Sequence, residues 1–156
     1  MRVDNLCNRN VIVVEQEANV LSAAKLMREH HVGSLIIIDS NTHGKKPIGI
    51  ISDRDIVIKV LAKEISLDKI KLHDIMDRDL ICVRDSDDTM DTVRIMCMEG
   101  IRRVPVINSA GDLIGILSMD DVFEMLADEL SNLAILICRQ HKHESQLPLA
   151  NKATSA

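Results

Sequence analysis

An internal repeat constrains this chain more than any single residue does. Adding 66 to each residue number of Gly49–Asp55 gives a second copy of that motif, Gly115–Asp121. Upstream, Arg9–Asp39 maps onto Arg78–Asn108 at a constant shift of 69. The two shifts differ by three residues, which places three extra residues of the first copy in the polar loop Ser40–Pro47. The sequence therefore predicts two similar halves that share one architecture.

The composition limits the classes of partner. The chain has 156 residues and is 46% hydrophobic, but it holds one Phe and no Trp or Tyr, so the predicted core is aliphatic. Without aromatic side chains on which bases could stack, single-stranded nucleic acid is disfavoured as a partner. The net charge of -5 disfavours duplex DNA and anionic membranes as well.

The four cysteines, Cys7, Cys82, Cys97 and Cys138, form no CxxC pair and lie in apolar segments. This pattern favours buried free thiols over a disulfide framework or a redox motif. The first residues contain no apolar signal region, and no apolar run is long enough to span a bilayer. These features together favour a protein of the reducing cytoplasm.

Each repeat has the pattern of a β-α-β-β-α unit. Short apolar runs predict buried strands, and the 3.6-residue spacing of Val20, Ala23 and Met27 predicts a helix. The predicted strands are 11–14, 34–38 and 48–51 in the first repeat, and 80–83, 104–107 and 113–117 in the second. The predicted helices are 20–30, 53–61, 88–98 and 119 to about 141. The expected fold class is α/β (α+β), with both repeats packed into one module.

The predicted domain boundaries follow from the repeat. They are a first repeat at 4–63, a linker at 64–72, a second repeat at 73–130, a C-terminal helical extension at 131–145 and a flexible tail at 146–156. The last helix has no breaker before Pro148 and is longer than its counterpart in the first repeat. Its apolar stripe has to pack either on its own domain or on another subunit.

The repeated motif places Ser52 and Asp55, and again Ser118 and Asp121, at a strand-to-helix junction. One interpretation is a capping box, in which the serine and the aspartate satisfy the first amides of the helix. The other interpretation is a ligand site at the carboxyl end of a sheet. There the carboxylate would accept hydrogen bonds from ribose hydroxyls, and the helix N-terminus would suit a phosphate.

The chain from about Asp4 to Leu130 resembles a tandem pair of CBS domains, named after cystathionine β-synthase. The resemblance rests on the two repeated motifs, on Asp74–Met76 and on Ile101–Val106. The chain is similar to small bacterial proteins that consist of little besides one pair of CBS domains. The resemblance implies two clefts between the repeats that bind AMP, ADP, ATP, NAD or S-adenosylmethionine, with AMP or ATP expected first. It also implies a homodimer in the shape of a flat disc.

The resemblance implies that the two clefts differ in composition. The first would use Ser118 and Asp121 for ribose, Arg103 for phosphate, and Ile12, Val32 and Gly33 as adenine walls. Asp120 would repel a phosphate there. Alternatively, Arg102 and Arg103 are solvated side chains that pair with Glu99 or Asp120.

The second cleft would use Ser52 and Asp55, with walls near Ile81 and Ile101. Ser34 stands where the first cleft has Arg103, so this cleft is expected to lack an arginine on its strand. Arg54 at the start of the following helix is expected to supply the positive charge instead.

Three functions compete at this point. The first is a regulatory module that senses an adenine nucleotide and signals through a dimer to a regulated protein. The second is a ligand-free interaction scaffold with vestigial clefts and a partner-binding C-terminal helix. An enzyme ranks third, because no nucleophile-base set or phosphate-binding glycine loop is present. No metal or required cofactor is expected, since His141 and His143 would point to different sides of a helix.

Overall fold

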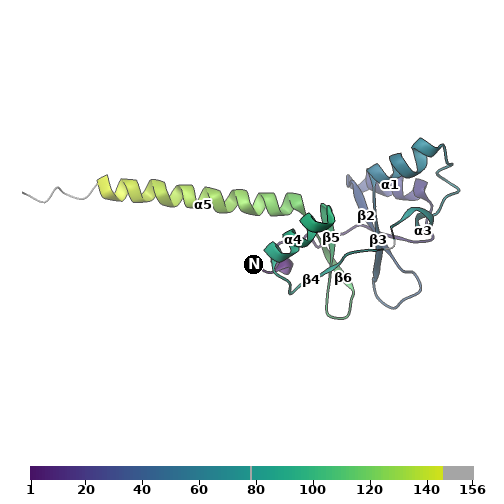
Figure 1. Ribbon diagram of the computed structural model, residues 1–156, viewed down its shortest axis with the longest axis horizontal. Helices are drawn as coiled ribbons and strands as arrows, with labels where there is room; N and C mark the ends of the chain where they lie inside the picture. Colours follow the sequence, from purple (N-terminus) through teal and green to yellow (C-terminus); the bar gives the residue numbers. More distant parts are fainter. Residues whose placement is uncertain (78, 146–156) are drawn as a thin grey trace, which may run out of the picture. The chain divides into compact units, whose positions relative to one another are not determined.

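The computed structural model describes residues 1–77 and 79–145, and its order of helices and strands follows the predicted repeat (Figure 1). It is a mixed α+β fold with two three-stranded sheets, as the sequence predicts. The chain divides into two compact units, 1–119 and 120–156. The predicted flexible tail, 146–156, lies outside the described residues.

The first sheet has the order β1-β2-β3, in which β1 is parallel to β2 and β2 is antiparallel to β3. The elements of this repeat are β1 (Val13–Glu15), α1 (Val20–His30), β2 (Ser34–Ile38) and β3 (Pro47–Ser52). Helix α1 matches the predicted 20–30 because both of its ends are specified locally. The Asn19 side chain accepts a hydrogen bond from the Ser22 amide, and His31 ends the helix in the left-handed conformation.

The second sheet repeats this topology in the order β4-β5-β6. Its elements are β4 (Val83–Arg84), α4 (Thr89–Glu99), β5 (Arg103–Ile107) and β6 (Leu113–Ser118). Asp88 caps the start of α4, and Gly100 ends it with a φ of 66°, which glycine adopts at little cost. The predicted repeat of elements is therefore confirmed.

The segment after β3 differs from the single helix predicted at 53–61. It starts as α2 (Asp53–Asp55), widens into the π-helix η2 (Ile56–Val60) and tightens into the 3-10 helix η3 (Leu61–Lys63). Its middle contains the β-branched residues Ile56, Val57 and Ile58 in succession. Side chains of this kind crowd the preceding turn and weaken a regular α-helix.

Two short segments are exchanged between the repeats. Helix α3 (Leu72–Ile75) precedes the second sheet in the chain but packs on the first repeat, where the Leu72 amide donates to the Ala18 carbonyl at 3.0 Å. The 3-10 helix η1 (Val3–Asn5) precedes the first sheet but leads into a contact with the second repeat, where Asn8 and Ile116 exchange two backbone hydrogen bonds of 2.9 Å. Adding 69 to the residue numbers of η1 leads to α3, so the two segments are equivalent parts of the repeat.

The core of the first repeat is aliphatic, as predicted. It combines residues of α1, β2, β3 and η2 with Leu72 of the exchanged segment. The prediction of four buried thiols holds only for Cys7, because Cys82 is half-buried and Cys97 and Cys138 are exposed. Both exposed cysteines lie on amphipathic helices, where an apolar neighbour in the sequence does not imply the same face.

The second unit is dominated by α5 (Met119–Ser145), which starts where predicted and continues four residues beyond the expected His141. Its large apolar side chains from Phe123 to Ile137 are mostly exposed. Within 1–77 and 79–145, no helix combines the length and the apolar character needed to cross a bilayer.

Candidate functional site

The first copy of the repeated motif forms a complete capping box. The Ser52 hydroxyl donates to Asp55 Oδ2 at 2.7 Å, and the Ser52 amide donates to the same oxygen at 2.9 Å. In return, the Asp55 amide donates to Ser52 Oγ at 3.2 Å. The capping interpretation is therefore confirmed for this copy. It also fixes the orientation of a carboxylate at the carboxyl end of β3.

A lysine connects this carboxylate to the chain that enters the second repeat. Lys59 Nζ lies 3.4 Å from Asp55 Oδ1 and 3.1 Å from Asp77 Oδ1, and it donates to the Ile75 carbonyl at 3.2 Å. Burial alone would raise the pKa of Asp55, but the Ser52 hydrogen bonds and the Lys59 charge outweigh it, so the pKa lies below its usual range. Asp55 is therefore an ionised hydrogen-bond acceptor at neutral pH.

A pocket of about 330 Å³ opens beside this carboxylate and is lined by residues of both repeats. Its lining residues are Ser34, Ile50, Ser52, Asp55, Gly100, Ile101, Arg102 and Arg103. A smaller pocket of about 110 Å³ shares three of these residues, Ile50, Ile101 and Arg103. It adds Asp77, Asp79, Leu80 and Ile81. We call these two adjoining pockets the Ser52 cleft; the larger one alone reaches the size range of small-molecule sites.

The Ser52 cleft brings together four residues that the sequence analysis grouped. Ser52, Asp55 and Ile101 line the larger pocket, and Ile81 lines the smaller one. The lining therefore combines an anionic acceptor with isoleucine side chains. The grouping is observed, whereas the binding role of each residue stays a prediction.

Strand β2 begins with Ser34 and supplies no arginine, as expected, but the equivalent strand β5 brings an arginine to the same cleft. Arg103 lines both of its pockets, and Arg102 lines the larger one. Ser34 and Arg103 are the first residues of the equivalent strands β2 and β5, and both line the same pocket, so the arginine complements the serine. The expected substitute, Arg54, is exposed and is not one of the lining residues.

The residues of the other predicted cleft are distributed over both units. Ser118 ends β6 opposite Arg103, whereas Asp121, like Asp120, lies in the first turn of α5. Since Asp121 belongs to the second unit, its grouping with Ser118 and Arg103 stays a prediction. Of the predicted adenine walls, Ile12 and Val32 pack against the core of the first repeat, and the Gly33 carbonyl accepts from the Asp53 amide at 3.0 Å.

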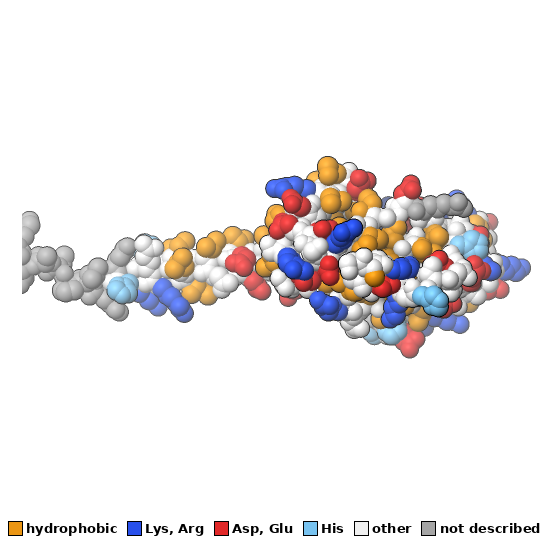
Figure 2. Space-filling view, turned by 90° about the horizontal axis from the view of Figure 1, so that it is seen from below, with side chains coloured by type: hydrophobic (Ala, Val, Ile, Leu, Met, Phe, Trp, Pro, Cys, Tyr) orange, Lys and Arg blue, Asp and Glu red, His pale blue; other side chains and the backbone are white. Residues whose placement is uncertain are grey.

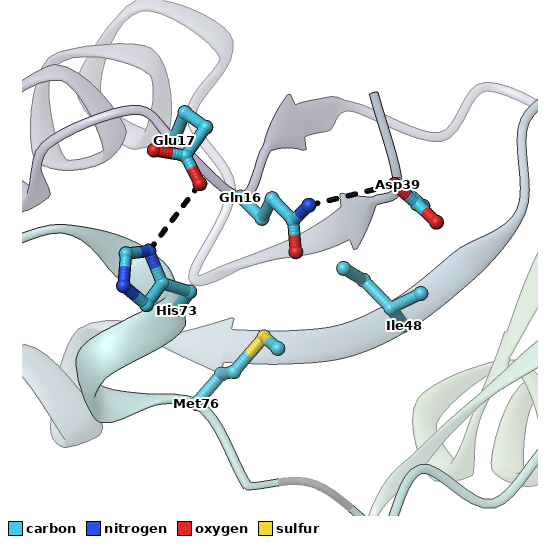
Figure 3. Close-up of a pocket in the computed structure, with 6 residues that line it drawn as sticks. All are labelled: Gln16, Glu17, Asp39, Ile48, His73 and Met76. Atoms are coloured by element: carbon cyan, nitrogen blue, oxygen red, sulfur yellow. Dashed lines mark hydrogen bonds and ion pairs between the residues drawn. The ribbon is translucent and has the colours of Figure 1, made fainter. Parts of the chain in front are cut away.

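A further pocket, which the sequence reasoning missed, lies where α3 packs on the first repeat (Figure 3). Its volume is about 490 Å³, and it is lined by Gln16, Glu17, Asp39, Ile48, His73 and Met76. His73 Nδ1 lies 3.6 Å from Glu17, which Lys71 also contacts at 2.6 Å. Within 1–77 and 79–145, no cluster of three or more His, Cys, Asp or Glu side chains could hold a metal ion.

Comparison with known proteins agrees with the predicted family. The family model of the CBS domain matches residues 3–62 and again 72–128. An uncharacterized protein of Methanopyrus kandleri is 35% identical over 123 residues, which make up 79% of this chain but only 61% of that protein. The chain therefore spans less than two thirds of this relative.

Solved structures of CBS-pair proteins from bacteria and archaea share the fold. A CBS domain protein from Pyrobaculum aerophilum, complexed with AMP, superposes with a TM-score of 0.71 at 26% identity and covers 78% of this chain and 89% of its own. A CBS domain pair in complex with 5'-methylthioadenosine and S-adenosyl-L-methionine gives a TM-score of 0.72 at 26% identity, with 83% and 98% covered.

Proposed function

This chain belongs to the family of CBS-domain proteins, and we propose that it is a regulatory module that binds an adenosine-containing ligand in the Ser52 cleft. The observation that carries the proposal is the composition of that cleft. An ionised aspartate, Asp55, lines its larger pocket together with two arginines, Arg102 and Arg103. A nucleotide needs both an anionic acceptor and a cationic group, and this pocket is lined by both.

Each part of a nucleotide has a suitable counterpart. Ribose hydroxyls donate hydrogen bonds, and Asp55 Oδ1, which contacts Lys59 at 3.4 Å, has capacity to accept them. Phosphate oxygens accept from guanidinium groups in strong, charge-assisted geometry. The isoleucines Ile50, Ile81 and Ile101 offer an apolar wall for a base in a chain with almost no aromatic side chains.

The bound ligands of two similar proteins, AMP in one and 5'-methylthioadenosine with S-adenosyl-L-methionine in the other, support adenosine as the common element. We propose AMP or ATP for this chain, because the two arginines favour a phosphorylated ligand. Binding would regulate by favouring one of two conformations of a homodimer that contacts a cytoplasmic partner protein. The module itself would be non-catalytic.

Titration calorimetry with AMP, ADP, ATP, NAD, S-adenosylmethionine and adenosine tests this function. The Arg103→Ala variant should weaken phosphorylated ligands at least about tenfold, or about 1.4 kcal/mol, while leaving adenosine unchanged. The Asp55→Asn variant should weaken every ligand, including adenosine. Arg54→Ala is the matched control, because this exposed arginine does not line the cleft and should bind as the parent does.

A second function is favoured by one observation, the exposed apolar side chains of α5. An interaction scaffold would use this helix and leave the clefts without a ligand. If nucleotide-free protein gave neither heat nor a higher melting temperature with any member of the panel, the sensor would be excluded and the scaffold would remain.

A further inference from the structure

Helix α5 carries an exposed apolar seam with the spacing of a coiled coil. Phe123, Leu126, Leu130, Leu133 and Ile137 follow one another at alternating intervals of three and four residues. This is the a and d pattern of the heptad repeat, which lines up on one side of a helix. Each of these side chains is between 40% and 67% exposed. An apolar seam of this kind is expected to pack against another protein surface, since its exposure to water is unfavourable.

The charges on α5 change sign along its length (Figure 2). Its first half carries Asp120, Asp121, Glu124, Asp128 and Glu129, and the segment after the seam carries Arg139, His141, Lys142 and His143, with Glu144 as its one acidic residue. No residue from Leu130 to Cys138 is charged. The helix dipole favours such charges only in the first and last turns, whereas Asp128 and Glu129 lie in the third turn. The separation of charge therefore extends beyond what the dipole favours.

We propose that α5 pairs with α5 of a second copy of this chain in antiparallel orientation. The charge order decides the direction, because a parallel pair would set acidic halves side by side. An antiparallel pair sets each acidic half against a basic half. The contact is isologous, since both copies contribute the same surface, as in a closed twofold dimer.

The apolar seam selects the register, and the charges agree with the antiparallel direction. When Leu130 faces Leu133 of the second copy, Leu126 faces Ile137 of the second copy. These residues form continuous apolar layers, and Phe123 faces Gln140 at each end. The same alignment sets Glu124 at the height of Arg139 of the second copy and Asp121 at the height of Lys142. These side chains lie away from the seam, so they contribute through the overlap of an acidic half with a basic half and not as ion pairs across the contact. Small residues beside the seam, Ala127 and Ala134, permit close approach of the two helices.

This pairing does not depend on the proposed nucleotide function. It uses residues 120–143, whereas the Ser52 cleft is lined by residues between Ser34 and Arg103. A dimer made through the repeats would be a separate contact. The two proposals can therefore fail independently.

Sedimentation velocity of the full chain tests whether α5 pairs. Leu133→Glu places a charge in the seam and should halve the number of chains in the assembly. Ile135→Glu is the matched control, since it makes the same kind of change at a residue 50% exposed, against 56% for Leu133, but outside the seam. It should leave the assembly unchanged. Both variants should keep the parental nucleotide titration and the parental melting curve of the repeats.

Disulfide trapping tests the direction, in a background where the exposed Cys97 and Cys138 are replaced by serine. Mixed Leu126→Cys and Ile137→Cys chains should form a disulfide-linked pair under mild oxidation. Leu126→Cys alone should not, because its two copies would lie about 16 Å apart along an antiparallel pair, too far for a disulfide. Self-linking of Leu126→Cys, or an assembly that Leu133→Glu leaves intact, would overturn the proposal and assign the seam to another occupant.

Discussion

Replacing Gly115 by alanine should destabilise the repeats through a single close approach. A Cβ atom at Gly115 would lie 2.8 Å from Cys7 Sγ and 3.1 Å from the Asn8 carbonyl oxygen. That carbonyl already accepts from the Ile116 amide at 2.9 Å, and the Asn8 amide donates back to the Ile116 carbonyl. The new methyl group therefore has to displace a backbone segment that two hydrogen bonds hold in place.

Gly49, the equivalent residue of the first repeat, supplies the comparison for the magnitude. Its added Cβ would lie 3.0 Å from the flexible end of Met76 and 3.4 Å from Ile37 Cδ1, so side chains alone can adjust. Neither glycine has a positive φ, so alanine fits the backbone and restricts the unfolded chain, a gain of about 0.4–1 kcal/mol. Overpacking costs about 1–3 kcal/mol where the neighbours are fixed. With the middle of both ranges, the net loss at Gly115 is about 1.3 kcal/mol. Gly49→Ala is close to neutral, because its neighbours can adjust.

Urea unfolding followed by circular dichroism measures both variants in parallel. Gly115→Ala should lower the free energy of unfolding by the stated amount, and Cys7→Ala in the same chain should restore part of it by removing the nearest atom. If Gly115→Ala were as stable as Gly49→Ala, the argument from close approach would be refuted.

Two further predictions concern ionisable groups. Burial raises the pKa of the Cys82 thiol, so Cys82 should react with a disulfide reagent at least about tenfold more slowly than exposed Cys97. Peptide mass spectrometry measures both labelling rates, and equal rates would contradict this prediction. Because the folded-state pKa of Asp55 is lowered, its stabilisation is complete at neutral pH and is lost as the pH falls toward that pKa. Asp55→Asn should therefore lower the free energy of unfolding by about 1 kcal/mol at pH 7 and by progressively less below about pH 4. Urea titrations at each pH measure this difference. A difference that stays constant with pH would exclude the carboxylate as its cause.

Local signals explain the elements that the sequence predicted well. Strand β2 matches the predicted 34–38, because its apolar run ends at Asp39, the polar residue just before the loop Ser40–Pro47. Helix α1 matches because Asn19 and His31 terminate it. The irregular segment after α2 was missed, since three β-branched residues in succession weaken a helix without a proline or glycine to mark the change.

Tertiary contacts explain what the sequence did not predict. The exchange of η1 and α3 depends on backbone hydrogen bonds such as that from Leu72 to Ala18, which no local sequence pattern predicts. Arg103 was assigned to one cleft by its position in the second copy, yet its side chain lines the Ser52 cleft. Sequence position specifies the strand from which a side chain starts, and the packing of the two sheets decides which cavity it reaches.

The exchanged segments also restrict how this architecture can be inherited. A cut in the stretch 64–71 would leave η1 on the fragment that needs α3, and α3 on the fragment that needs η1. Each fragment would hold the short segment that packs on the sheet of the other fragment. Its own sheet would then lack a buried residue such as Val3 or Leu72. A gene segment that encodes one copy of the repeat therefore does not encode a unit that folds by itself. Recombination can transfer the pair, and two separately expressed halves should regain structure only when they meet.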